Sequence, residues 1–203
     1  MPRSKELNQQ MRDKRRESIL RKSLRLFAYD GYDSLTVDGI ADACRCSHGL
    51  FYYYFKSKEE LFNAVVETYS AKYPTLRAEI NRIEEMHGLA GLEELCGFIA
   101  KLLCEGGEKL LLARLVEVRR SAYSISEEVR STLKIYDGRD LISRLQKEAQ
   151  NEGTGRMEKA EWVTSFFLDW FTGISYRRIR YKGLDFKCPK PEYILKFFVK
   201  TTD

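Results

Sequence analysis

Apolar residues recur every three to four positions along most of the chain, which is the period of amphipathic helices. The first such run covers about residues 12–29 and ends at Asp30-Gly31, where glycine can take the left-handed conformation that closes a helix. Further runs predict helices at about 37–43 and 47–55, and a longer helix that begins near residue 57 and meets Pro74. We expect later helices at about 89–104, 107–122, 126–151, 157–181 and 190–200, so the predicted fold is all-α.

The segment between residues 34 and 60 carries the local signals of a helix-turn-helix. Ser34 or Thr36 offers an N-cap oxygen to the helix at 37–43, and Ser47 caps the helix that follows. The three residues Cys44-Arg45-Cys46 leave room only for a tight turn between them. Because consecutive aromatic residues cannot all point to one side of a helix, part of the run 51–55 must face outward, as a helix that enters the major groove requires. Ser57 and Glu60 form a capping box for the next helix.

Composition limits the class of protein. The chain has 203 residues, 43% of them hydrophobic, which suffices for one or two globular domains. The N-terminus lacks the apolar stretch of a signal peptide and no run of roughly 18 apolar residues occurs, so we expect a cytoplasmic protein without a membrane partner.

Five cysteines, odd in number and widely spread, argue against a disulfide framework. Their spacing also lacks the two ligand pairs of a zinc site, so we expect small buried hydrophobic residues, no metal and no cofactor. A thiol sensor at Cys44 and Cys46 is the alternative.

Positive charge gathers at the N-terminus. Residues 1–25 hold nine basic and three acidic side chains, a surplus of six, while the whole chain has a surplus of five. Such a basic arm attracts phosphate backbones, although a solvated tail that keeps the protein in solution has the same composition.

Several motifs together resemble the DNA-binding domain of the TetR family of bacterial transcriptional regulators. They occur in order over about residues 14–66: Phe27-Ala28-Tyr29-Asp30-Gly31-Tyr32, Thr36-Val37, Ile40-Ala41, Ser47-His48-Gly49, Phe51-Tyr52-Tyr53-Tyr54-Phe55 and Lys56-Ser57-Lys58-Glu59-Glu60-Leu61. The resemblance implies a helix-turn-helix DNA-binding domain with its basic arm at residues 1–58, and an all-helical regulatory and dimerisation domain at residues 59–203.

The resemblance also implies which residues meet DNA. Phosphate anchoring is expected from Thr36, Tyr53, Tyr54 and Lys58, and base or groove contacts from Val37, His48, Gly49, Leu50 and Tyr52. The family usually has glycine and then an aliphatic residue where this chain has Arg45 and Cys46. Arg45 is therefore expected in a left-handed conformation, at a cost of about 1 kcal/mol, with its guanidinium as a further phosphate contact.

A resembling protein is expected to work as a homodimer on a roughly palindromic operator, as a repressor that a small hydrophobic effector releases. Candidate lining residues of the effector pocket are Phe98, Leu102, Leu115, Arg119, Tyr123 and Trp170. Candidate residues of the dimer interface are Phe166, Phe167, Phe171, Ile174, Tyr193 and Phe197. Repression and activation both stay open, and Pro74 is either a helix boundary or a hinge.

Two other classes of function compete with this hypothesis. A small enzyme would use Cys104 with His87, or the carboxylates Glu93, Glu94 and Glu105, but their spacing imposes no catalytic geometry and we expect no enzyme. A helical interaction module would use the basic arm to bind membranes or RNA. Selective binding to one palindromic DNA duplex separates the first hypothesis from both.

Overall fold

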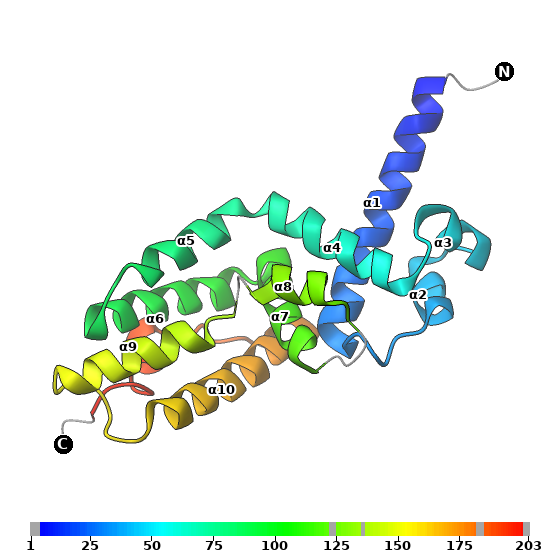
Figure 1. Ribbon diagram of the computed structural model, residues 1–203. Coiled ribbons are helices and arrows are strands. Elements are labelled where there is room, and N and C mark those ends of the chain that lie inside the picture. The colour runs from blue at the N-terminus through cyan, green and yellow to red at the C-terminus, as the bar shows by residue number, and fades with distance from the viewer. Residues whose placement is uncertain (1–4, 122–124, 135–136, 182–184, 201–203) are drawn as a thin grey trace. The chain divides into compact units, whose positions relative to one another are not determined.

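The computed structural model describes residues 5–121, 125–134, 137–181 and 185–200, and it is all-α as predicted (Figure 1). Within these residues, extended backbone pairs at a single isolated antiparallel bridge, between Gly155 and Val199. The chain divides into two compact units. The first holds the residues up to Lys72 together with Leu115–Leu133, and the second holds Tyr73–Arg114 and the residues from Lys134 onward. The predicted domain boundary after residue 58 stays a prediction.

The first unit is built on α1 (Lys5–Asp30), which packs against α2 (Val37–Cys44) and α4 (Lys58–Lys72). Its apolar residues Ile19, Leu24 and Phe27 are fully buried, whereas residues 5–14 are exposed. The helix ends where the sequence predicts, because Gly31 takes a φ of 80° directly after Asp30. The exposed N-terminal half of α1 thus forms the basic arm, while the C-terminal half contributes buried residues to the core of the unit.

The short α3 (His48–Tyr54) completes the packing of this unit. Ile40 of α2, Phe51 of α3 and Phe62 of α4 are fully buried, and the ring of Phe62 meets that of Phe27 edge to face at 4.8 Å. α8 (Glu127–Lys134) and the C-terminal part of α7 (Gly107–Ser121) also belong to this unit.

The second unit is a layered helical bundle. It contains α5 (Pro74–Glu84), α6 (Gly88–Glu105), α9 (Arg139–Asn151), α10 (Ala160–Arg180) and α11 (Pro191–Leu195). α6 lies beside α5, α9 and α11, and α9 also packs against α10 (Figure 1). Leu92, Leu103 and Leu145 fill its core with no exposed surface.

Carboxylates from α9 cap the N-terminus of α6. Glu148 accepts a hydrogen bond from the backbone N–H of Gly88 at 2.9 Å, and Glu152 accepts one from Leu89 at 2.9 Å. Arg144 donates to Glu148 at 2.9 Å and to the carbonyl oxygens of Glu84 and Met86. The bond from Gly88, followed by the contacts from Arg144 and His87, lowers the pKa of Glu148 to about 2. This cluster fixes the loop between α5 and α6.

Two of the predicted helices need correction, and one helix was not predicted. No separate helix was expected at residues 74–84, yet Pro74 stands at the first position of α5, where its missing N–H costs nothing. Pro74 is therefore a helix boundary, as predicted. The single helix expected at 126–151 is two, α8 and α9, with Asp137-Gly138 before α9.

The helix expected at 190–200 is limited to Pro191–Leu195. Beyond it, the carbonyl of Phe198 accepts hydrogen bonds from the N–H of Arg156 at 2.8 Å and from the buried amide of Gln146 at 3.1 Å. Pairing with another segment thus replaces the last helical turns.

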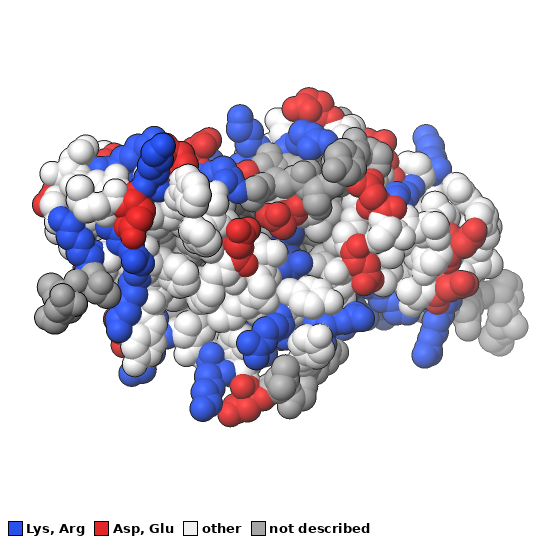
Figure 2. Space-filling view, turned by 90° about the horizontal axis from the view of Figure 1, so that it is seen from below, with Lys and Arg blue, Asp and Glu red and all other residues white. Residues whose placement is uncertain are grey.

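Charged side chains of both signs are interspersed on the face shown in Figure 2, around uncharged surface. That face accordingly carries no extended field of one sign, in contrast to the basic arm of α1. Among the described residues, no helix combines the length and the apolar character that crossing a membrane requires.

Candidate nucleic-acid interface

The turn between α2 and α3 has the caps that the sequence predicts. Thr36 is the N-cap of α2 and accepts a hydrogen bond from the N–H of Gly39 at 3.1 Å. Ser47 is the N-cap of α3 and accepts from Leu50 at 3.2 Å. Between them Arg45 takes φ 54° and ψ 49°, which confirms the predicted left-handed conformation. The N–H of Cys46 reaches back to the carbonyl of Ala41 at 2.9 Å, closing α2 in a Schellman-like turn.

The aromatic run of α3 divides between the core and the surface. Phe51 and Phe55 are buried, and Tyr54 is half-buried. Tyr52 and Tyr53 keep 45% and 59% of their surface exposed. Because the buried rings anchor the helix, the two exposed tyrosines are held in place at its surface.

The other predicted contact residues lie around the same two helices. Thr36, Arg45, His48 and Gly49 are exposed, and Val37 and Leu50 are half-buried. All of them belong to the first unit. The structure thus assembles nine of the ten predicted DNA-binding residues on α2, α3 and the turn, and places the tenth, Lys58, at the start of α4.

Lys58 has a structural role that the sequence does not reveal. Its ammonium group donates to the carbonyl oxygens of Tyr32 at 2.9 Å and Leu35 at 2.8 Å, and it lies 4.2 Å from the centre of the Tyr32 ring. These bonds turn the side chain toward the loop 31–36, so two of its three donors are already used. Lys58 therefore holds the loop that carries Thr36, and its role as a phosphate anchor stays a prediction.

Basic residues of α1 also support the turn, which sequence reasoning missed. Arg15 donates to the carbonyl of Arg45 at 2.5 Å, and Lys22 donates to that of Cys44 at 3.1 Å. Both cations thus neutralise the negative end of α2. Nearer the N-terminus, Arg12 lies 5.9 Å from the centre of the Tyr53 ring. The sequence shows the excess of basic residues but not the groups that these residues contact.

A second missed residue is Asp38 in the first turn of α2. One of its carboxylate oxygens lies 2.5 Å from Nδ1 of His48, and both side chains are exposed. Ten residues separate them in the sequence, with the turn between, so no local pattern predicts the contact.

The cysteines of this unit behave as packing residues. Cys44 is buried, and burial raises the pKa of its thiol above the ordinary value. A thiol that resists ionisation is a poor sensor, because the thiolate is the reactive form. Cys46 is half-buried beside it.

Two of the candidate effector residues share a hollow. Phe98 and Leu102 line a small hollow of the second unit with Leu76 and the charged residues Glu79 and Lys101. Leu115 is fully buried and belongs to the first unit, and its place in this set stays a prediction. Trp170 instead contacts the rings of Phe167 and Phe197, at 5.7 and 5.1 Å. The side chain of Arg119 and the whole of Tyr123 lie outside the described residues.

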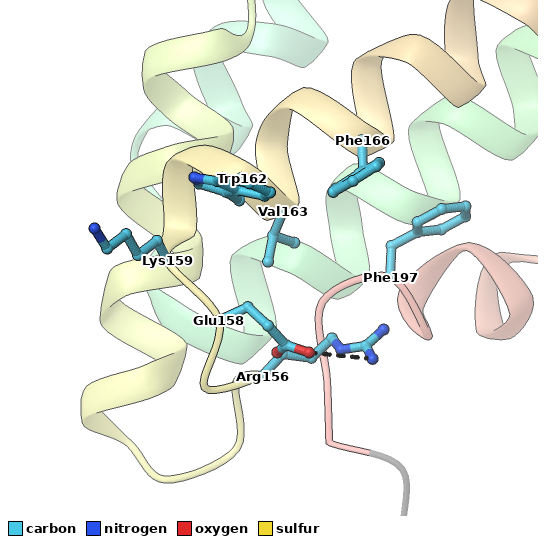
Figure 3. A pocket seen from close by; sticks show the side chains of 7 residues that line it. All are labelled: Arg156, Glu158, Lys159, Trp162, Val163, Phe166 and Phe197. Carbon is cyan, nitrogen blue, oxygen red and sulfur yellow. Dashed lines mark ion pairs between the residues drawn. The ribbon is translucent and has the colours of Figure 1, made fainter.

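A larger hollow of about 610 Å³ lies along α10 (Figure 3). Trp162, Val163 and Phe166 from α10 and Phe197 from beyond α11 line its apolar side, and the ion pair of Arg156 with Glu158, 3.4 Å apart, lies at its edge. The hollow therefore lies on the face where the sequence predicts a subunit contact.

The predicted interface residues differ in exposure. Phe166 is 63% exposed and Tyr193 is also exposed, while Phe171, Ile174 and Phe197 are half-buried. Phe167 is 1% exposed because its ring packs on that of Phe198 at 4.9 Å. Phe167 is thus a core residue, and its assignment to the interface is corrected.

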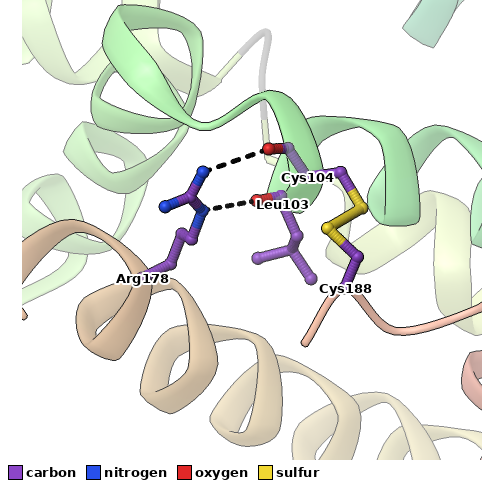
Figure 4. Close-up of a disulfide and its surroundings, with 4 residues drawn as sticks. All are labelled: Leu103, Cys104, Arg178 and Cys188. Atoms are coloured by element: carbon purple, nitrogen blue, oxygen red, sulfur yellow. Dashed lines mark hydrogen bonds between the residues drawn. A yellow bond between two sulfur atoms is a disulfide. The ribbon is translucent and has the colours of Figure 1, made fainter. Parts of the chain in front are cut away.

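A disulfide joins Cys104, in the last turn of α6, to Cys188 (Figure 4). This pairing corrects the expectation that the cysteines are unpaired. Arg178 lies beside it and donates to the carbonyl oxygens of Leu103 at 3.1 Å and Cys104 at 3.2 Å. The link fixes residues near the C-terminal segment to α6.

The disulfide also removes the nucleophile of the enzymatic alternative. Moreover, Cys104 and His87 lie at opposite ends of α6, about 25 Å apart at 1.5 Å per residue. The carboxylates are engaged as well, Glu94 with Arg82 and Glu105 with Lys109. In the part of the chain that the structure describes, no group of three or more His, Cys, Asp or Glu side chains is placed to hold a metal ion.

Comparison with known proteins agrees with this geometry. Residues 19–65 match the family described as bacterial regulatory proteins, tetR family. Over 90 residues the chain is 30% identical to the HTH-type transcriptional repressor NicS of Pseudomonas putida, a match that covers 44% of this chain and 42% of NicS. The chain spans less than half the length of the curated relatives it matches.

Two solved structures share the fold over most of both chains. The ketosteroid transcriptional regulator KstR2 of Mycobacterium tuberculosis has a TM-score of 0.61 at 18% identity, over 92% of this chain and 96% of that one. AibR, solved in complex with isovaleryl coenzyme A and operator DNA, has a TM-score of 0.59 at 19% identity, over 90% of this chain and 94% of that one.

Proposed function

We propose that the chain, whose residues 19–65 match the tetR family of bacterial regulatory proteins, is a ligand-responsive transcriptional regulator that binds operator DNA. The observation that carries the proposal is the exposed face of α2 and α3. There Thr36, His48, Tyr52 and Tyr53 surround a capped turn, and the buried Phe51 holds α3 in place. A rigid short helix with an exposed polar and aromatic face is what major-groove docking requires.

Within this face, Thr36, Tyr53, Tyr54 and Arg45 bind phosphates. Val37, His48, Gly49, Leu50 and Tyr52 face base edges and thymine methyl groups. Lys58 acts mainly by holding the loop that precedes Thr36, and its remaining N–H is available to a phosphate. The exposed basic arm of α1 adds attraction that depends on salt and not on sequence.

The active form is a homodimer that joins through α10 and the residues after α11. The apolar hollow with Phe166 and Phe197 supports this assignment, together with the exposed Tyr193 and the half-buried Phe171 and Ile174. A soluble monomer rarely leaves so many large apolar groups uncovered on one face. Two copies place two α3 helices at the fixed separation that a palindromic operator needs.

The effector is a small hydrophobic molecule that binds the second unit. AibR was solved with isovaleryl coenzyme A, which has an apolar acyl group, and KstR2 is described as a ketosteroid transcriptional regulator; both descriptions support an effector with an apolar part. An effector that prefers the form unable to bind DNA lowers operator affinity by its own preference between the two forms. We assign the output as repression, as the name of NicS states for that relative, and the site of action as the cytoplasm, where operator DNA lies.

The direct test is selection of bound duplexes from a random pool. The proposal expects enrichment of one palindrome. Tyr53→Phe, which removes only a hydroxyl, should weaken binding to it by about 3- to 10-fold, the worth of one hydrogen bond. Tyr181→Phe is the matched control, because Tyr181 is an exposed tyrosine of the second unit, and it should bind as the wild type does. A pool without enrichment, or equal losses in both variants, would refute the assignment.

The dimer is tested separately by sedimentation. Phe166→Ser should shift the protein toward monomer and lose operator binding, while Met157→Ser, another exposed apolar residue of the second unit, should stay dimeric. A wild-type protein that is monomeric at micromolar concentration contradicts the dimer proposal. Reporter transcription with and without an intact operator then separates repression from activation.

A further inference from the structure

An acidic side chain lies on the face that is proposed to meet DNA. Asp38, in the first turn of α2, keeps 75% of its side chain exposed. An unbalanced carboxylate at this place would repel phosphates. Its presence therefore calls for a partner that engages the carboxylate in the complex.

That partner is His48, the first residue of α3. Its Nδ1 lies 2.5 Å from a carboxylate oxygen of Asp38, and its ring lies 4.8 Å from that of Tyr52. The imidazole is thus held on one side by a hydrogen bond and on another by an aromatic ring, yet 56% of it stays exposed. Because Nδ1 is engaged, Nε2 is the nitrogen that remains for an outside partner.

The pair is not required to hold the two helices together. Ile40, Ala41 and Cys44 of α2 and Phe51 of α3 are buried in the core, and both helices carry their own N-caps. An exposed ion pair adds little to such packing. Its position next to Tyr52, on the exposed side of α3, fits recognition better than support.

We propose that Asp38 is a positioning residue for base readout: it fixes the His48 ring so that Nε2 meets the edge of one base in the major groove. This inference rests on the proposed function. Each base pair presents its own pattern of hydrogen-bonding groups in the major groove, so a ring nitrogen held in one place discriminates among them.

The test uses the palindrome selected by the wild-type protein and, at each base pair in turn, the three other base pairs. One base pair should matter most: its replacement should weaken wild-type binding by about 10-fold, the worth of one good base contact. Asp38→Ala and His48→Ala should each reduce that discrimination to less than about twofold, and the double variant should lose no more than either single one. Thermal unfolding should be nearly unchanged in Asp38→Ala.

Asp42→Ala is the matched control, because Asp42 is another exposed carboxylate of α2. It removes the same charge and should keep the full discrimination at that base pair. If Asp38→Ala discriminates as well as the wild type, or binds all duplexes more tightly with unchanged preference, the inference is refuted. A wild-type protein without any sequence preference instead overturns the proposed function on which it rests.

Discussion

Replacing Arg45 by glycine should stabilise the first unit, because Arg45 is the non-glycine residue of the described chain that has a positive φ. Its backbone, at φ 54° and ψ 49°, closes α2 through hydrogen bonds from its own N–H and from that of Cys46. None of these bonds uses the Arg45 side chain. The bond that Arg15 donates to the Arg45 carbonyl is likewise preserved in the variant.

The magnitude follows from two opposing effects. A side chain with a Cβ costs about 1–2 kcal/mol in the left-handed region, and glycine removes this cost. Glycine also makes the unfolded chain more flexible, which lowers the free energy of unfolding by about 0.4–1 kcal/mol. The net expectation for Arg45→Gly is about 0.5–1 kcal/mol of added stability.

The assay is urea unfolding followed by far-ultraviolet circular dichroism, since both tryptophans, Trp162 and Trp170, lie in the second unit and do not report on the first. Arg45→Asn should fall between glycine and wild type, because asparagine tolerates this conformation, and Arg45→Ala should equal wild type. Operator affinity should fall alike in all three variants if the guanidinium binds a phosphate. A glycine variant that is less stable than Arg45→Ala would refute the reasoning about backbone strain.

Three further predictions concern contacts that lie inside one or the other of the two units. The pKa of Glu148 is lowered from 4.5 to about 2, so the stabilisation from its carboxylate is present above pH 4.5 and is lost as the pH falls toward 2. Glu148→Gln should cost about 1–2 kcal/mol of unfolding free energy at pH 7 after allowance for solvent screening. Unfolding midpoints of both proteins between pH 2 and 7 measure this cost. Lys58→Met should cost about 1–3 kcal/mol in the first unit, because two carbonyl oxygens lose their donor, and calorimetry checks it against operator affinity. Cys188→Ser should cost about 2–4 kcal/mol, because it opens a link between residues 84 apart; the difference should vanish when the wild type is reduced with dithiothreitol.

The helix-turn-helix was predictable because its signals are local. Thr36 and Ser47 cap the helices that directly follow them. α1 ends at Asp30, one residue after the predicted end, and Gly31 follows with a positive φ. The alternation of buried Phe51 with exposed Tyr52 and Tyr53 follows from helical geometry alone. The left-handed conformation of Arg45 was expected from the resemblance, since the family usually has glycine at that place.

The contacts that could not be predicted join residues far apart in the sequence. Lys58 reaches the carbonyls of Tyr32 and Leu35, and Cys104 pairs with Cys188 across 84 residues. The segment after Leu195 has helical periodicity, but the pairing of Phe198 with Arg156 overrides it. No spacing rule encodes such partners, because only the folded backbone brings them together.

The same limit applies to the predicted sites. The expected contact residues on α2 and α3 were named from the resemblance, whose motifs occur in order in this chain. The candidate effector residues come from several helices in two units, and of those that the structure describes, Phe98 and Leu102 share a hollow. Asp38 was missed because its partner, His48, lies on the other side of the turn.

The central claim is that the face of α2 and α3 reads operator DNA. It is tested most directly by the ratio of dissociation constants for the selected palindrome and a scrambled duplex of equal composition, measured from 50 to 200 mM salt by fluorescence anisotropy. The account predicts a preference of about 10³-fold or more at every salt concentration, while both affinities fall as salt rises. Equal affinity for the two duplexes, with the same salt dependence, would show that the protein binds only phosphates and would contradict the account.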